Sequence, residues 1–114
     1  MSNGLTEKNG LNAALKHEIA SGRKNVQRVN RCGYDLISKG NGEERHIEVK
    51  TTDKSTFARR WLEEKEYQAL QTDKRFWVYL VTNANSKPEI HELDAAEVSR
   101  RYKRTVKHYW FDFS

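Results

Sequence analysis

The dipeptide Asn41-Gly42 constrains the fold more than any other feature of the sequence. It lies near the middle of the stretch GYDLISKGNGEERHIEVK, residues 33–50. Asn-Gly is the strongest short-range signal for a two-residue β-hairpin turn, because both turn positions favour positive φ. The flanking residues alternate between apolar and polar, as in a half-buried strand. We therefore expect paired strands at about 33–38 and 45–52.

The register that follows from this turn sets Asp35 directly opposite Glu48. Like charges in opposite positions destabilise a sheet, so the pair needs an explanation. Lys50 is two residues beyond Glu48 and therefore lies on the same face. A divalent cation such as Mg²⁺ prefers hard oxygen ligands and would remove the repulsion between the two carboxylates. The main-chain carbonyl of Val49 is a further expected ligand.

This arrangement would supply the minimum chemistry for phosphodiester hydrolysis. A metal held by Asp35 and Glu48 would bind the scissile phosphate and lower the pKa of a bound water. Lys50 would orient that water or stabilise the charge that develops on the phosphate. The alternative is that the two carboxylates are ordinary solvent-facing residues and that Lys50 compensates their charge.

The rest of the chain predicts an α/β domain with a mixed sheet. We expect one domain over residues 1–114, with residues 1–8 flexible. The remaining elements follow from periodicity, capping and turn signals. They are a helix over 10–22 with Leu11, Leu15 and Ile19 on its apolar side, a strand over 25–30, a loop over 53–60, a helix over 61–71, strands over 75–82 and 89–93, and a last helix that opens at a capping box of Asp94 and Glu97.

The charge of the chain is unevenly distributed. The net charge is +5, and residues 100–114 hold five Lys or Arg against one Asp. A basic run mixed with aromatic residues suits phosphate contacts and base stacking, although a solvated helix end leading into a core strand is an equal alternative. The loop over 53–60 would flank the carboxylate face. The candidate nucleic-acid contacts are Lys54, Arg59, Arg60, Arg100, Arg101, Lys103, Arg104, Lys107 and Trp110.

Several other classes of protein are disfavoured by the composition. Cys32 is the single cysteine, so there is no internal disulfide and no thiolate cluster for structural zinc. No apolar run approaches the length of a membrane span. The N-terminal stretch MSNGLTEKNG is not of signal-peptide type. We therefore expect a cytoplasmic or nucleoid-associated protein without a membrane partner.

The stretches GYDLIS and IEVKTT, followed by WLEEKEYQAL and FWVYLVTN, resemble the PD-(D/E)xK nuclease superfamily. They look most like the nuclease-like domain at the C-terminus of the NO VEIN protein, and they are also similar to archaeal-type Holliday junction resolvases. The resemblance covers about residues 10–93. It implies a restriction-endonuclease-like αβββαβ core, with Asp35 and Glu48 as metal ligands and Lys50 as the catalytic lysine.

The sequence departs from this family pattern in its first helix. Resolvase-like members usually carry a glutamate there in a G-x-x-A-E type stretch, and the matching stretch GLNAA has Ala14 in its place. Glu18 lies one helical turn later and is the expected substitute. By the same resemblance, Gln68 on the second helix falls where such nucleases place a supporting polar residue, and its alternative is an exposed helix residue.

Two functional hypotheses follow. The first is an endonuclease that acts on DNA with Mg²⁺ or Mn²⁺ and forms a homodimer to cut both strands. The second is a nuclease-like fold that binds nucleic acid or a protein partner without cleavage, which the departure at Ala14 favours. DNA is the expected substrate, and RNA stays open as an alternative.

Overall fold

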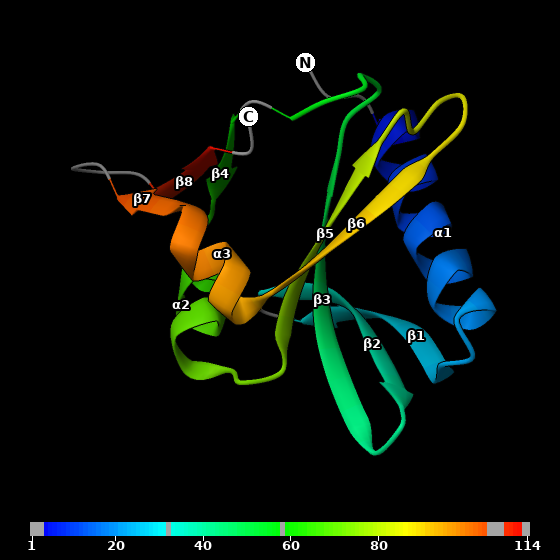
Figure 1. Cartoon of the computed structure of the whole chain (residues 1–114), viewed down its shortest axis with the longest axis horizontal. Helices are drawn as coiled ribbons and strands as arrows, with labels where there is room; N and C mark the ends of the chain where they lie inside the picture. Colours follow the sequence, from blue (N-terminus) through cyan, green and yellow to red (C-terminus); the bar gives the residue numbers. More distant parts are fainter. Residues whose placement is uncertain (1–3, 32, 58, 105–108, 113–114) are drawn as a thin grey trace.

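Two β-sheets and three helices make up the computed structural model of the chain (Figure 1). It describes the backbone of residues 4–31, 33–57, 59–104 and 109–112, and the side chains of residues 4–29, 33–57 and 62–101. The main sheet has the strand order β1-β2-β3-β5-β6, with β1 (Lys24–Arg31), β2 (Tyr34–Gly40), β3 (Glu43–Thr51), β5 (Phe76–Thr82) and β6 (Glu89–Asp94). The second sheet has the order β4-β8-β7, with β4 (Arg59–Leu62), β7 (Tyr102–Arg104) and β8 (Tyr109–Asp112). The helices are α1 (Gly4–Ala20), α2 (Glu64–Thr72) and α3 (Ala95–Arg101).

The β2–β3 hairpin has the predicted turn and register. Asn41 and Gly42 both have positive φ, 52° and 74°, as a two-residue hairpin turn requires. Leu36 pairs with Ile47, and the register continues without a break to the turn. The side-chain period of two therefore sends Leu36 and Ile47 to one face of the sheet.

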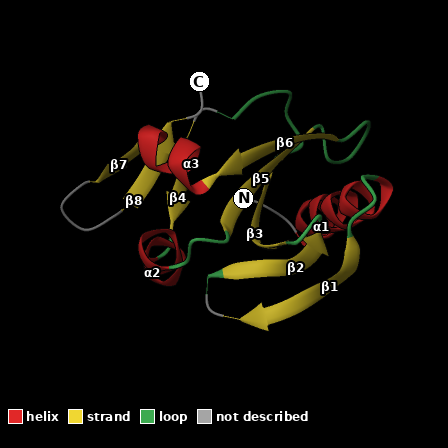
Figure 2. Cartoon of the chain, turned by 60° about the horizontal axis from the view of Figure 1, so that its bottom comes forward, coloured by secondary structure: helices red, strands yellow, loops and turns green. Residues whose placement is uncertain are grey.

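The main sheet is mixed, as predicted. Strand β3 runs parallel to β5, whereas the other three neighbouring pairs are antiparallel. The polar strand β6 forms one edge of the sheet. Helix α1 lies on one side of the main sheet, and α2, α3 and the second sheet lie on the other (Figure 2).

Strand β5 contributes side chains to the hydrophobic cores on both faces of the main sheet. Phe76, Val78 and Leu80 join the core formed with α2 and α3. Tyr79 joins a smaller core on the other face, beneath α1. A strand covered on both faces needs apolar residues at nearly every position, and this explains the continuous apolar run of β5.

The stretch predicted as one helix over 61–71 is divided between two elements. Trp61 and Leu62 belong to β4, and α2 begins at Glu64. Leu62 pairs with Tyr109 of β8 and is buried in the core shared with α2. Pairing with a strand nearly fifty residues away therefore overrides the local helix propensity. The basic stretch 100–114, for which a helix end leading into a strand was one of two alternatives, supplies β7 and β8 of this sheet.

Helix α1 is longer than the sequence pattern indicates. It begins at Gly4, within the stretch expected to be flexible, and it ends two residues before Gly22. Ala14 is fully buried, whereas Ile19, expected on the apolar side, is 57% exposed. Among the residues that the structure describes, none of the helices combines the length and the apolar character needed to cross a lipid bilayer.

Candidate active site

A polar cavity of about 390 Å³ lies where α1, β2, β3 and α2 meet. Five carboxylates and two lysines contribute to its lining, so its charge is acidic. The carboxylates come from four different elements or their caps, and Asp35 and Glu48 are among them. The charged lining residues are Glu7, Asp35, Glu48, Lys50, Glu63, Lys65 and Glu66.

Hydrogen bonds and ion pairs join three strands or helices within this cavity. The backbone N–H of Val49 donates to Asp35 Oδ2 at 2.9 Å, which holds β2 and β3 together at the carboxylates. Lys50 Nζ lies 3.3 Å from Glu48 Oε2 and donates to Glu66 Oε1 of α2 at 2.8 Å. The structure thus brings Asp35, Glu48 and Lys50 together, and it adds Glu66.

The carboxyl groups of Glu48 and Glu66 are both buried and affect each other. Burial, together with the negative charges of Glu66 and Asp35, raises the pKa of Glu48 to about 10 against the opposing effect of Lys50. Burial also opposes ionisation of Glu66, but Lys50 more than offsets it and holds the pKa of Glu66 below its ordinary value. The pair therefore retains one proton at neutral pH.

The other two titratable groups of the site respond to the same surroundings. Burial raises the pKa of Asp35, although the N–H of Val49 partly offsets this effect. Burial opposes the charged form of Lys50, yet Glu48 and Glu66 outweigh it and raise the pKa of the ammonium group. Lys50 is therefore a cation held beside both acids.

This donor set fits a divalent cation. Asp35 and Glu48 offer hard oxygen ligands, which Mg²⁺ and Mn²⁺ prefer, whereas Glu66 Oε1 already accepts hydrogen bonds from Lys50 and Glu63. Burial raises the pKa values of Asp35 and Glu48 in the metal-free protein, so a cation that binds them must displace protons. Val49 also lines the cavity, and its N–H is already used by Asp35.

Glu7 is the first-helix acid of this cavity, and sequence reasoning missed it. The sequence contains two Gly-Leu pairs, at residues 4–5 and 10–11, and our comparison used the second. The first pair begins α1 and is followed by Glu7, which lines the cavity. A glutamate at Ala14 would instead fall in the buried core beneath α1. The Gly-Leu pair at residues 4–5 was the feature of the sequence that could have identified Glu7.

Glu18, the expected substitute, does not line the cavity. It is fully buried and accepts a hydrogen bond from Tyr79 Oη at 2.8 Å. Arg23 Nε lies 3.3 Å from its other oxygen. These contacts give Glu18 a role in holding α1 on the sheet and separate it from Asp35 and Glu48.

Gln68 is also outside the cavity. It is exposed on α2, where its Nε2 donates to Glu64 Oε2 at 2.8 Å. The acidic residue of α2 that lines the cavity is Glu66, two positions earlier. Its spacing of three from Glu63, as in a capping box, marks the start of a helix but carries no signal for a site, so the sequence pattern could not have identified it.

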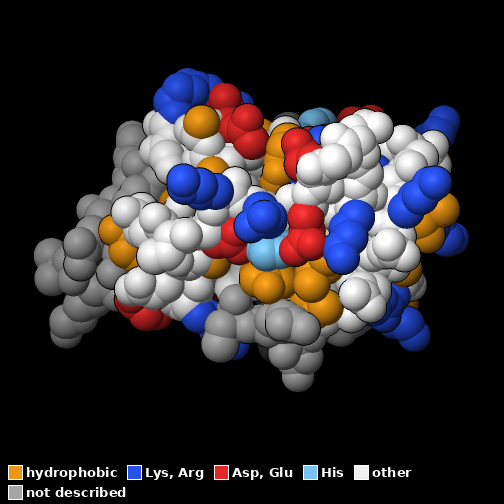
Figure 3. All heavy atoms as spheres, turned by 90° about the horizontal axis from the view of Figure 1, so that it is seen from below, with side chains coloured by type: hydrophobic (Ala, Val, Ile, Leu, Met, Phe, Trp, Pro, Cys, Tyr) orange, Lys and Arg blue, Asp and Glu red, His pale blue; other side chains and the backbone are white. Residues whose placement is uncertain are grey.

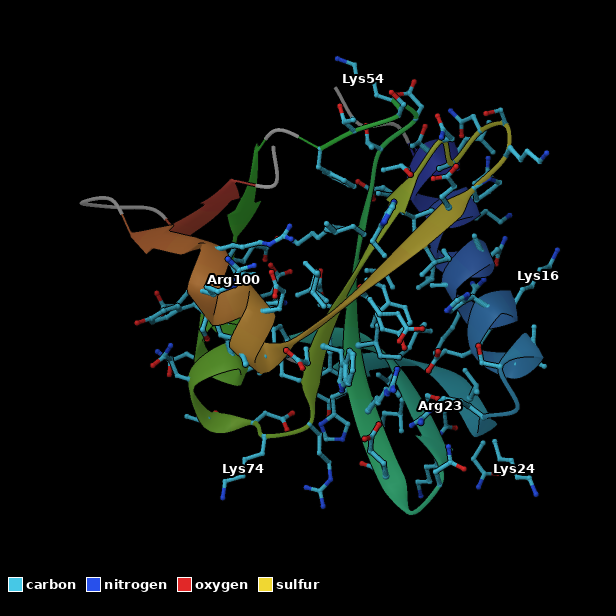
Figure 4. The ribbon with its side chains drawn as sticks, in the orientation of Figure 1. Lys16, Arg23, Lys24, Lys54, Lys74 and Arg100 are labelled. Atoms are coloured by element: carbon cyan, nitrogen blue, oxygen red, sulfur yellow. The ribbon has the colours of Figure 1, made fainter. Side chains whose placement is uncertain are left out.

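The candidate nucleic-acid contacts are scattered over the molecule. Lys54 is exposed on the loop after β3, whereas Arg100 lies on α3 (Figure 4). Arg100 and Arg101 both pair with Glu97, the second at 2.7 Å. Lys107 lies outside the described residues. The side chains of Arg59, Arg60, Lys103, Arg104 and Trp110 are also outside the described part, although their backbones place them in β4, β7 and β8.

A second group of potential ligands lies beneath α1. The ligand atoms of His17, Glu18 and Glu92 are within 4.8 Å of one another. Arg45 Nη1 donates to Glu92 at 2.8 Å, and Arg23 pairs with Glu18. Because two guanidinium groups already compensate these acids, we assign no metal to this group.

Comparisons with known proteins agree with this architecture. A Holliday junction resolvase, Hjc, from the archaeal hyperthermophile Archaeoglobus fulgidus has a similar solved structure, with a TM-score of 0.67, 18% sequence identity, and coverage of 92% of this chain and 82% of that chain. This likeness confirms the predicted restriction-endonuclease-like fold. No curated protein sequence gives a significant match.

The family comparison covers the elements that build the cavity. The model described as Protein NO VEIN, C-terminal, matches residues 6–93. This range extends from the first turn of α1, next to Glu7, through β3 and α2 to β6. The chain therefore belongs to the NO VEIN C-terminal family, whose matched region contains every described residue that lines the acidic cavity.

Proposed function

We propose that the chain is a Mg²⁺-dependent endonuclease that hydrolyses phosphodiester bonds in DNA. The observation that carries this proposal is the convergence of Asp35, Glu48 and Lys50 on one acidic cavity, with Lys50 Nζ 3.3 Å from Glu48 Oε2. The fold likeness to a Holliday junction resolvase supports it. Mn²⁺ should substitute for Mg²⁺, because it accepts the same oxygen ligands.

Each side chain then has a distinct role. Asp35 and Glu48 would hold the cation, together with the main-chain carbonyl of Val49. A bound divalent cation supplies charge neutralisation at the phosphate and lowers the pKa of a water molecule. Lys50 would orient the attacking water or stabilise the negative charge that develops on the phosphate oxygens.

The reaction is a simple displacement at phosphorus. The water oxygen forms a bond to phosphorus, and the bond from phosphorus to one sugar oxygen breaks. The proton released by the water balances the proton that the leaving alcohol takes up. The result is one phosphate monoester end and one hydroxyl end.

The distribution of charge indicates where the nucleic acid would bind. Residues 4–29, 33–57 and 62–101, whose side chains are described, hold fifteen Lys or Arg and fifteen Asp or Glu, and are therefore neutral. On the face seen from below, basic and acidic side chains are interspersed (Figure 3). The whole excess of positive charge comes from the rest of the chain. The basic residues there are Arg31, Arg59, Arg60, Lys103, Arg104 and Lys107.

Four of these six basic residues belong to strands β4 and β7 of the second sheet. The register of this sheet aligns Trp61, Trp110 and Lys103 in one row. Basic residues bind phosphates, and aromatic residues stack on bases. We therefore propose the second sheet as the principal nucleic-acid contact. Strand β4 leads directly into Glu63 at the rim of the cavity, so bound DNA would extend to the site.

A second candidate function is a nuclease-like module that binds nucleic acid or protein without cleavage. The burial of Glu48 favours it, because burial raises the pKa of this carboxyl group and a metal must displace its proton to bind. We also propose a homodimer for cleavage of both strands.

Cleavage of supercoiled plasmid and of a synthetic four-way junction tests the proposal. The wild type should cut at least one substrate with Mg²⁺ or Mn²⁺ and should stop when EDTA is added. Glu48→Ala and Lys50→Ala should abolish cutting without loss of DNA binding. Glu89→Ala is the matched control, since Glu89 is an exposed acid at the start of β6, and it should cut normally.

The two functions predict different results. Metal-independent DNA binding, with no cutting of either substrate by the wild type, would overturn the nuclease and favour the binding module. An RNA substrate tested in parallel distinguishes the two nucleic acids.

A further inference from the structure

Lys50 has two acidic partners, and the nearer one is not on its own strand. Its Nζ lies 2.8 Å from Glu66 Oε1 and 3.3 Å from Glu48 Oε2. The three residues are 9%, 6% and 6% exposed, so water screens these ion pairs little. The acid on α2 thus fixes the ammonium group at least as closely as Glu48 does.

Glu66 is itself held firmly. Its Oε1 also accepts a hydrogen bond from the backbone N–H of Glu63 at 3.0 Å, within the capping box of α2. The helix in turn lies tightly against the start of β2 at Gly33. A Cβ at Gly33 would be 2.8 Å from Lys65 O and 2.7 Å from Ala69 Cβ. Glu66 is therefore an acceptor on a helix fixed close to Asp35.

We propose that Glu66 is a positioning residue that keeps Lys50 in the site when a divalent cation is bound. A carboxylate of Glu48 that coordinates a cation has less charge to offer Lys50, and the cation repels the ammonium group. Without another anion, Lys50 would turn toward solvent. Glu66 supplies that anion from a separate element. The consequence for cleavage rests on the nuclease function proposed above, whereas the position of Lys50 does not.

The side-chain ammonium signal of Lys50 in ¹⁵N-edited NMR spectra tests this directly, with Lys50→Arg to assign it. In the wild type the signal should persist as Mg²⁺ is added to saturation. In Glu66→Gln it should broaden or disappear on addition of Mg²⁺, because the amide oxygen retains the hydrogen-bond acceptor but not the charge. Glu64→Gln is the matched control in the same helical turn, since Glu64 is exposed and pairs with Gln68, and it should behave as the wild type.

Activity and metal affinity provide the second measurement. For Glu66→Gln, kcat should fall by about a hundredfold with KM unchanged, as expected when a catalytic group is misplaced. The affinity for Mn²⁺ should fall by about tenfold or less, because the variant loses a nearby charge but no ligand. A large loss of Mn²⁺ affinity would make Glu66 a metal ligand and overturn the proposal.

Two further outcomes are decisive. A Lys50 signal that disappears from the wild type on addition of Mg²⁺ would overturn the proposal, and this measurement needs no variant to fold. A signal that persists in a wild type without cleavage activity would support the positioning role and overturn the nuclease function.

Discussion

Gly10 of α1 lies directly against Thr51 of β3. A Cβ added at position 10 would be only 2.1 Å from Thr51 Oγ1. This close approach sets the distance of α1 from the main sheet, and the first turn of α1 carries Glu7 to the cavity. Gly10→Ala should therefore destabilise the protein by about 1–3 kcal/mol through overpacking. Urea unfolding measures this change. Gly4→Ala is the control, since a Cβ there meets nothing within 4 Å, and an equal effect of both variants would contradict the explanation.

The hairpin shows how far local sequence can determine a fold. The turn at Asn41-Gly42 fixes both the register of the hairpin and the face of the sheet on which each side chain lies. The proximity of Asp35, Glu48 and Lys50 could therefore be predicted from this local signal. The second sheet could not be predicted in this way. Its strand β4 pairs with β8, and no local pattern encodes a partner so distant in the chain.

Glu48→Gln should separate metal binding from stability. Burial raises the pKa of Glu48 to about 10, so its carboxyl group is protonated at neutral pH in the metal-free protein. Glutamine resembles that neutral form, and the free energy of unfolding should change by less than about 1 kcal/mol. The increase in Tm that Mn²⁺ gives the wild type should disappear. Thermal unfolding with and without Mn²⁺ measures both, and Mn²⁺ stabilisation that survives in the variant would contradict the assignment.

Mutation of Glu18 should lower the stability of the protein, whereas mutation of Glu7 should lower its affinity for Mn²⁺. Glu18→Ala removes a fully buried acid and leaves Arg23, whose side chain is 7% exposed, without this partner. The loss of one member of a buried pair costs about 3–5 kcal/mol. Glu7→Gln should leave stability nearly unchanged but weaken Mn²⁺ binding. Urea unfolding and Mn²⁺ titration check both, and a stable Glu18→Ala with weakened Mn²⁺ binding would return Glu18 to the site.

The acids of the first helix and of α2 show why the site was only partly predictable. Hairpin residues are positioned by a turn a few residues away, whereas Glu7 and Glu66 reach the cavity through the packing of whole helices. That packing depends on close contacts such as Gly10 with Thr51 and Gly33 with Ala69. A family pattern aligned to the wrong Gly-Leu pair consequently assigned the helix acid to the buried Ala14.

Glu92 should contribute to the acid sensitivity of the fold. Partial burial opposes its charged form, but His17 at 2.6 Å and Arg45 at 2.8 Å outweigh this and lower the pKa of Glu92 below 4.5. Because the folded pKa is the lower one, the unfolded state binds more protons in acid. The stabilisation is therefore present above pH 4.5 and is lost as the pH falls through the folded pKa.

Glu92→Gln should accordingly be less stable than the wild type at neutral pH, with a difference that shrinks below pH 4.5. Urea unfolding across this pH range measures the difference. Glu89→Gln, on the same strand, is the control and should follow the wild type at every pH. A constant difference between Glu92→Gln and the wild type would point to lost packing instead of lost charge.

Lys103 of β7 should contribute to nucleic-acid affinity in a way that Lys74 does not. Lys103 belongs to the second sheet, whereas Lys74 is an exposed lysine of the electrically neutral part of the chain. Each cation that contacts a phosphate releases counterions, so Lys103→Ala should lower the slope of log Kd against log salt concentration by about 1. Lys74→Ala should leave the slope unchanged. Binding of labelled DNA to the metal-free protein at several salt concentrations measures both slopes without any cleavage. Equal slopes for the two variants would show that the DNA binds elsewhere than the second sheet.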